Sequence, residues 1–128
     1  MPVPLVDVAS FERVVQTGAP AIGNLTRTPD GRWFFPVRVP VARDGELKFV
    51  LSAVVRPEAV RTVLTRQDLP ADWVISIVDA NNLRIARSRA HEGNLGGRLS
   101  DSGQQVVDSG RERDGFGISV TLEGERIY

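Results

Sequence analysis

The stretch from Asp72 to Ser88, DWVISIVDANNLRIARS, constrains the fold most strongly, because it predicts a β-hairpin. Residues 73–78 are aromatic, β-branched and apolar almost throughout, which is typical of a strand covered on both faces. Residues 79–82, Asp-Ala-Asn-Asn, are turn residues, since Asn and Asp tolerate left-handed backbone and bond their own main chain. Residues 83–87 then alternate between apolar and polar side chains, as a returning strand does.

Composition limits the classes of protein that this chain can belong to. A length of 128 residues suits one domain with its own core. The formal net charge is zero, which argues against a surface for nucleic acid or anionic membrane. The chain has no cysteine, which excludes disulfides, thiol catalysis and Cys-ligated metal sites. We expect no cofactor.

The first half of the chain predicts an amphipathic helix followed by an antiparallel meander. Apolar residues recur at helical spacing over residues 7–17, and the strand at 33–41 has apolar side chains at every second position from Trp33 to Val41. Pro36 and Pro40 both remove amides from the same edge of that strand. We therefore place it at a sheet edge or beside a partner that pairs only partly. The strand at 47–55 is apolar enough at its middle to be central.

The second half predicts a helix, the hairpin, a loop and a last strand. Pro57 suits the first position of a helix, where its missing amide costs little. Residues 90–110 are polar and Gly-rich, and we expect a loop there with a helical turn at 100–107. Residues 116–122 alternate as a half-buried strand. The predicted fold is α+β, with a mostly antiparallel sheet of about five to six strands, an N-terminal amphipathic helix and a connecting helix.

Several stretches resemble Cache domains, the PAS-like extracytoplasmic sensor modules of bacterial histidine kinases, diguanylate cyclases and chemoreceptors. The opening Phe11–Leu25 looks like their helix-plus-strand start. Their meander pattern PV-x-x-dG-x-x-x-GVL is similar to Val37–Val41, Asp44-Gly45 and Phe49–Ala53. Their hairpin pattern W-V-x-x-(I/V)-D-x-x-G-R-I-(V/I)-A-R-S is similar to Trp73–Asp79 with Arg84–Ser88. The resemblance covers Phe11 to Tyr128, and it departs at Asn82, where the family usually has glycine.

The resemblance implies a PAS-like, non-catalytic sensor that binds a small ligand at the periplasmic face of the bacterial inner membrane. No apolar run reaches the roughly 20 residues that cross a bilayer. We therefore expect residues 1–128 to be one sensor domain, a fragment of a longer membrane-anchored receptor that forms a homodimer. An alternative is the junction of two PAS-like modules near residues 57–72. The chain length favours a single sheet that gathers all the strands.

Five residues are candidates for ligand contact. Asp79 ends an apolar strand, and strict alternation places Arg87 on the same face as Leu83 and Ile85. A carboxylate and a guanidinium there could orient a small carboxylate or amino acid. In the alternative, Asp79 caps its own turn and Arg87 is solvated. Arg38, between two prolines, is a comparable candidate. Trp33 and Trp73 are more often core aromatics than ligand platforms.

Catalysis has little support in the sequence. His91 is the only histidine, it lies in the predicted loop, and we expect it at the surface. No nucleophile motif surrounds any serine, and the acidic residues lack the spacing of a calcium loop. We expect no catalytic residue and no metal. The competing hypothesis is a PAS-like dimerisation or scaffold module that binds no small molecule.

Overall fold

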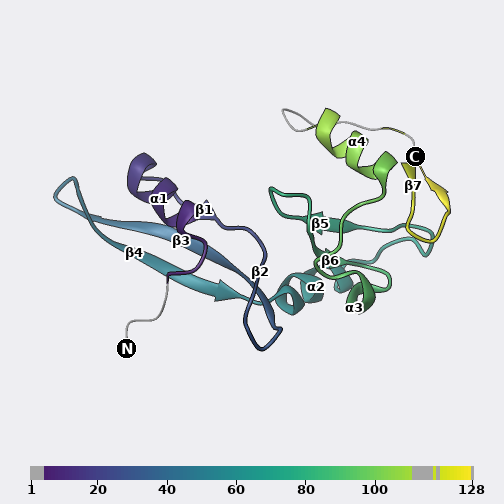
Figure 1. Ribbon diagram of the computed structural model, residues 1–128, viewed down its shortest axis with the longest axis horizontal. Helices are drawn as coiled ribbons and strands as arrows, with labels where there is room; N and C mark the ends of the chain where they lie inside the picture. Colours follow the sequence, from purple (N-terminus) through teal and green to yellow (C-terminus); the bar gives the residue numbers. More distant parts are fainter. Residues whose placement is uncertain (1–4, 111–116, 118, 128) are drawn as a thin grey trace.

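The computed structural model describes residues 5–110, 117 and 119–127, which form a small α+β domain with antiparallel sheets and a few helices. Figure 1 shows an elongated molecule with two halves joined at α2. The N-terminal half contains α1 (Val8–Thr17), β1 (Ala21–Ile22), β2 (Thr26–Arg27), β3 (Trp33–Arg43) and β4 (Glu46–Val55). The rest contains α2 (Pro57–Thr65), β5 (Ser76–Val78), β6 (Arg84–Arg87), α3 (His91–Asn94), α4 (Asp101–Ser109), β7 (Ser119–Val120) and β8 (Arg126–Ile127).

Strand β3 is the centre of a four-stranded antiparallel sheet. It pairs along its length with β4 on one side, while β1 and β2 pair with separate parts of its other side. The gap between β1 and β2 lies beside Pro36, which has no amide and whose carbonyl accepts from the Gly23 amide at 2.8 Å. The expectation of a partly pairing neighbour for β3 is therefore confirmed. Strand β4 is an edge strand of the described sheet, so the prediction that it is central is wrong.

Helix α1 covers one face of this sheet. Ser10 and Val14 are fully buried on it, and Gly18, with φ of +64°, ends the helix in the left-handed conformation. Asp7 precedes the helix, but its side chain does not cap it. Its carboxylate instead accepts from the Asn24 amide at 3.0 Å and so ties the helix start to the segment between β1 and β2.

The expectation of one sheet is wrong for the described residues. Strands β5 and β6 form a separate two-stranded sheet, and so do β7 and β8. The first strand of the hairpin is also shorter than predicted and begins at Ser76 rather than Trp73. The returning strand ends at Arg87. Just upstream of β5, Ile75 still bonds to the returning chain, since its carbonyl accepts from the Ser88 amide and its amide donates to the Ser88 hydroxyl, each at 2.9 Å.

The core joins the two halves. Its buried centre is formed by Leu25, Phe35 and Ile85. Partly buried side chains packed around them are Trp33, Val37, Val55, Val60, Ile77, Leu83 and Leu95. The inner end of the β3–β4 hairpin thus packs against α2 and the β5–β6 hairpin, on the sheet face opposite α1.

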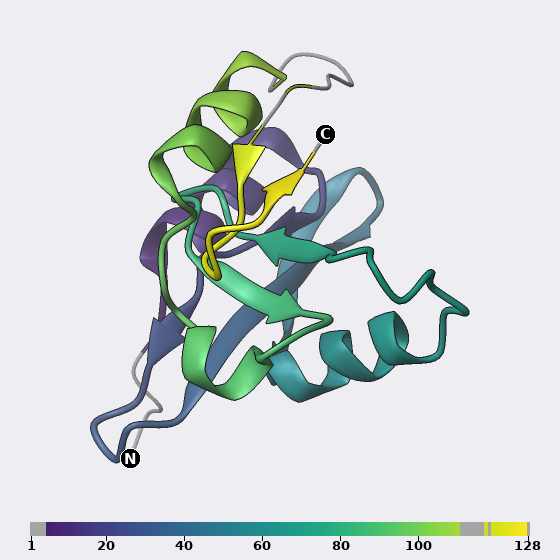
Figure 2. The same ribbon diagram turned by 90° about the vertical axis from the view of Figure 1, so that its right-hand side faces the viewer.

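The C-terminal half is layered around β5–β6. Figures 1 and 2 show α2 and α3 on one side of this hairpin, and α4 with β7–β8 on the other. The segment predicted as a loop therefore contains two helices. Ser100 begins α4 by accepting from the Gly103 amide at 3.2 Å, which is N-cap chemistry. Of the described residues in the predicted strand at 116–122, only Ser119–Val120 form a strand, β7, while Phe116 and Ile118 lie outside the described residues. Ser119 and Thr121 are buried there and Val120 and Leu122 are exposed, so the apolar side chains of this segment do not form its buried face.

Candidate functional site

A β-bulge in the β5–β6 hairpin positions the candidate site. The turn is as expected, since Asn82 has φ of +60° and its amide donates to the Asp79 carbonyl at 3.0 Å. Ser76 is opposite Arg87, but Val78 is opposite Arg84, which leaves Ile85 as an extra residue. An extra residue reverses the alternation beyond it. Arg87 therefore shares a face with Arg84, and the prediction that it shares the face of Ile85 is wrong.

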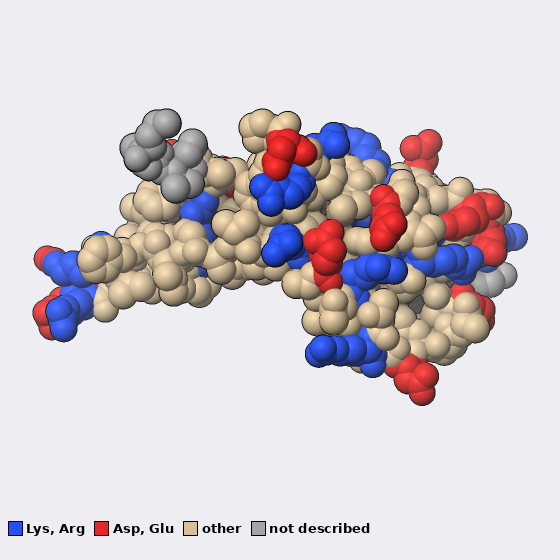
Figure 3. Space-filling model, turned by 90° about the horizontal axis from the view of Figure 1, so that it is seen from below, with Lys and Arg blue, Asp and Glu red and all other residues tan. Residues whose placement is uncertain are grey.

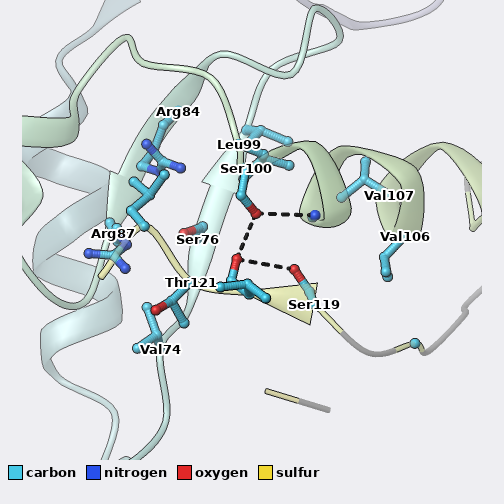
Figure 4. A pocket seen from close by; sticks show the side chains of 15 residues that line it. Val74, Ser76, Arg84, Arg87, Leu99, Ser100, Val106, Val107, Ser119 and Thr121 are labelled. Carbon is cyan, nitrogen blue, oxygen red and sulfur yellow. Dashed lines mark hydrogen bonds between the residues drawn. The ribbon is translucent and has the colours of Figure 1, made fainter. Parts of the chain in front are cut away.

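This face of the hairpin forms the floor of a pocket of about 320 Å³ beneath α4 and β7. That volume is within the range of small-molecule sites. Figure 4 shows Arg84 and Arg87 on one side, and Val106 and Val107 of α4 on the opposite side. The apolar part of the lining consists of Val74, Val78, Leu99, Val106, Val107, Val120 and Leu122. Its hydroxyl groups belong to Ser76, Ser100, Ser119 and Thr121.

Arg87 is held by a carboxylate on the turn between β7 and β8. Its Nη1 and Nη2 donate to the two oxygens of Glu123 at 2.6 and 2.7 Å, and the Arg87 side chain is only 2% exposed. This bidentate bond lowers the pKa of the Glu123 carboxyl from 4.5 to about 2. Nη1 also donates to the Arg89 carbonyl at 2.8 Å. The pair fastens β7–β8 to the hairpin.

Arg84 is equally buried, at 2% exposure, but no carboxylate among the described residues is bonded to it. Its Nη1 and Nη2 donate weakly to the carbonyls of Asn94 and Arg98, at 3.2 and 3.3 Å. Its Nε is buried and has no hydrogen-bond partner among the described residues. Burial, and then the charge of Arg87, lower the pKa of the Arg84 guanidinium, which the charge of Glu123 only partly offsets.

The pocket is therefore positively charged at one end and apolar at the other. Of the two buried guanidinium groups, only that of Arg87 is bonded to a carboxylate of the described residues, and a buried positive charge is costly unless an anion accompanies it. Such a site can bind a small organic anion, with its charged group towards Arg84 and its apolar part against α4. The sequence contained both arginines, but strict alternation separated them, and only the bulge brings them together.

Asp79 does not line this pocket. Its carboxylate is 8% exposed and accepts the amides of Asn81, Leu83 and Leu25, each at 2.9 Å. The turn-capping alternative therefore describes its contacts, with an added long-range bond to Leu25. These contacts give Asp79 a structural role and direct it away from Arg87.

Arg38 lies on the α1 side of the four-stranded sheet and is 3% exposed. It donates to the Ser10 and Ser52 hydroxyls at 2.9 and 2.6 Å and to the Val6 carbonyl. Its guanidinium also lies over the Phe11 ring, 5.9 Å from the centroid. Arg38 therefore joins α1 to β3 and β4 and is not brought together with Arg87.

The two tryptophans have different environments. Trp33 packs against the core, and a Cβ on Gly96 would lie 2.5 Å from its ring. Trp73 is 61% exposed, so the expectation that it is a core aromatic is wrong. It borders a wider hollow whose polar lining includes the surface ion pair of Arg89 and Glu125. That hollow lacks buried charges, so we consider it the weaker candidate site.

His91 is buried, at 4% exposure, so the expectation of a surface histidine is wrong. It begins α3, and its Nδ1 accepts from the Arg87 amide at 3.3 Å. Burial, followed by the charge of Arg61, lowers the pKa of the imidazole. His91 therefore supports the backbone of β6 from the side of the hairpin opposite α4 and β7.

The described residues contain no group of three or more His, Cys, Asp or Glu side chains placed to hold a metal ion. None of their helices combines the length and hydropathy needed to cross a bilayer. Comparisons with protein-family models, with curated proteins and with solved structures found no match to this chain.

Proposed function

We propose that this chain is a small-ligand sensing module whose pocket binds an organic anion with a short apolar part. The observation that carries the proposal is the pair of buried guanidinium groups, Arg84 and Arg87, of which only Arg87 is bonded to a carboxylate of the described residues, that of Glu123. The buried Nε of Arg84, which has no hydrogen-bond partner in the part of the chain that the structure describes, supports the same conclusion. A ligand carboxylate would supply the second negative charge that this pair of arginines lacks.

The position of Glu123 suggests how binding would be relayed. Glu123 connects the β7–β8 hairpin to Arg87, while α4 and β7 form the opposite wall of the pocket. An incoming anion changes the electrostatic balance at Arg87 and so alters the strength with which β7–β8 is held. The ligand then favours one of two arrangements of this C-terminal element, by its differential affinity for them.

The wider setting is also a proposal. A PAS-like fold of the Cache type is supported by the order of elements (helix, meander, connecting helix, hairpin) and by the left-handed turn at Asn82. In that setting the domain belongs to a membrane-anchored bacterial receptor such as a sensor histidine kinase. It lies on the extracytoplasmic side of the membrane and works as a homodimer, while the domain itself performs no catalysis.

The test is a thermal-shift screen with aliphatic monocarboxylates from acetate to hexanoate and with α-amino acids. Matched alcohols and amines are the uncharged and cationic controls. A ligand at 100 times its Kd stabilises the folded state by about 2.7 kcal/mol, which is readily detected. We expect carboxylates of one size to raise the melting temperature and their matched alcohols to have no effect.

Two variants locate the site. Val107→Phe fills the apolar end of the pocket and should abolish the shift while the protein still melts cooperatively. Its matched control is Val63→Phe on α2, where the side chain is 58% exposed and remote from the pocket. Arg84→Met retains the bulk of the side chain without its charge and should remove the preference for carboxylates over alcohols. Equal shifts in Val107→Phe and the unmodified chain would refute the pocket assignment.

The alternative is a dimerisation or scaffold module that binds no small molecule. Its support is the exposed apolar face of the β3–β4 hairpin, since contiguous apolar surface of this kind marks interaction sites. A cooperatively melting protein that responds to none of the carboxylates, amino acids, alcohols or amines would favour this alternative.

A further inference from the structure

The outer half of the β3–β4 hairpin has an uncovered apolar face. The side of the sheet opposite α1 carries Val39, Val41, Leu47, Phe49 and Leu51, which are 36%, 41%, 37%, 72% and 63% exposed. Figure 3 shows this surface as a tan area without charged residues, bounded at the left by the charged tip of the hairpin. The inner end of the same face is the part that packs into the core.

The edge of the sheet next to this face is also open. Among the described strands, β4 pairs only with β3 along its ten residues, Glu46–Val55. Natural edge strands usually carry charges or prolines that prevent further pairing. Between Lys48 and Arg56 strand β4 has neither, and its middle, residues 49–51, is the apolar run that predicted a central strand. The strand therefore has the composition of a central strand at an edge position.

We propose that β4 pairs antiparallel with β4 of a second copy, which joins two four-stranded sheets into one. In a two-fold antiparallel pair one residue must lie opposite its own symmetry mate, because directly opposite side chains point to the same face. The axis that fits this chain passes through Leu51. On the apolar face Leu51 then lies opposite Leu51, and Phe49 lies opposite the small Ala53 of the other copy.

Charge selects this register over its neighbours. With the axis at Leu51, Glu46 lies opposite Arg56 of the second copy, and this pair occurs twice. Arg56 is exposed and has extended backbone, φ −87° and ψ 142°, so it can continue the strand. An axis at Ser52 would place Lys48 opposite Arg56, which is repulsive. An axis at Val50 would place Glu46 opposite Val54, so that Glu46 would meet no opposite charge across the strand pair and would keep only its ion pair with Lys48 of its own strand.

The antiparallel arrangement also places the uncovered apolar face of one copy next to the end of the same face that is packed into the core in the other copy. The inner end of one β4, where the core and α2 begin, comes beside the outer half of the other β4. The β4 edges would then pair, and the two apolar faces would become continuous across the axis. This surface is separate from the anion pocket, so the proposal goes beyond the sensing function and does not depend on it.

The first test is the mass of the unmodified chain by size-exclusion chromatography with light scattering. We expect twice the 14.0 kDa of one chain, and we expect Leu51→Glu to be monomeric with an unchanged circular dichroism spectrum. If the unmodified chain stays monomeric at every protein concentration tested, the proposal is overturned. Growth beyond a dimer would overturn it too, because a two-fold β4 pair is closed.

The second test measures the register by disulfide formation, for which the chain offers a background without cysteine. Under mild oxidation Leu51→Cys should form a covalent dimer, since opposed residues have Cα atoms about 4.5–5.5 Å apart. Phe49→Cys alone should not, but a mixture of Phe49→Cys and Ala53→Cys should. The control is Val63→Cys, an exposed position on α2. Equal cross-linking at positions 51, 49 and 63 would refute the register.

A charge exchange tests the same register without oxidation. Glu46→Arg alone and Arg56→Glu alone each place like charges opposite one another and should weaken dimerisation several-fold. The double variant restores opposite charges in both pairs and should recover the dimer. If the double variant dissociates at least as readily as the two single variants, the pairing of Glu46 with Arg56 is wrong.

Discussion

Replacing Asp79 by alanine tests whether this carboxylate is structural. The change removes the acceptor of three backbone amides, and bonds of this kind to a charged group contribute about 1.5–3 kcal/mol each. Two of the donors, Asn81 and Leu83, belong to the turn itself, where water can replace the lost acceptor. The third donor is the amide of Leu25, a residue that is 7% exposed and 54 positions away in the sequence.

We therefore expect Asp79→Ala to lower the free energy of unfolding by about 3 kcal/mol, mainly from the stranded Leu25 amide and the loosened turn. For a domain of this size the melting temperature should fall by about 10 °C. The measurement is urea unfolding followed by tryptophan fluorescence, with circular dichroism as the second probe. Asp68→Ala, at an exposed position after α2, is the control and should change stability by less than about 0.5 kcal/mol.

The result that would refute this reasoning is an Asp79→Ala variant as stable as Asp68→Ala. In that case the carboxylate would be free for a ligand, and the original hypothesis of ligand contact at Asp79 would regain support. A destabilised variant that still binds a carboxylate when folded would instead separate Asp79 from the pocket, as its contacts predict.

Three further predictions concern pH and packing. Because burial lowers the pKa of His91, the neutral form is favoured in the folded state. The contribution of His91 to the free energy of unfolding should therefore be fully present above pH ~6.5 and should decrease as the pH drops below that value. Proton NMR of this single histidine should show a midpoint below 6.5, and one at or above that value would contradict the assignment. The ion pair of Glu123 with Arg87 should stabilise the folded state fully above pH 4.5, and this stabilisation should be lost as the pH falls towards about 2. Urea titrations across that pH range should show this dependence in the unmodified chain and not in Glu123→Gln. Gly96→Ala should lower the free energy of unfolding by about 3 kcal/mol, because a φ of +74° is strained for alanine and the new Cβ would lie 2.5 Å from the Trp33 ring. Gly93→Ala is the control and should be tolerated, since a Cβ there would meet open space. Equal melting temperatures for the two variants would show that the ring moves aside.

Most of the local structure could be predicted from the sequence, because it depends on neighbouring residues. The amphipathic spacing of α1, Pro57 at the start of α2 and the Asn82 turn are all local signals, and all three features are present. The partial pairing beside β3 was also predictable, because a proline lacks its amide in any environment. The helices α3 and α4 were predicted only as a loop with a turn, since α3 has four residues and α4 is mostly polar, with Val106 and Val107 as its large apolar side chains.

The candidate site could be predicted only in part. Arg87 was selected from the sequence, and it does line the pocket, but its companion proved to be Arg84 rather than Asp79. The reason is the bulge at Ile85, which changes the face of every later residue and leaves no clear mark in the sequence. Glu123, 36 positions beyond Arg87, had no local signal at all.

By itself, then, the sequence determined the positions of α1, of α2 and of the Asn82 turn, because those depend on apolar spacing, on the place of a proline and on turn residues. The tertiary structure decided which strands share a sheet, that β4 is an edge, and that two arginines and a distant glutamate meet in one pocket. These are outcomes of register and long-range packing, in which a shift of one residue in a strand exchanges its faces without any change in its composition.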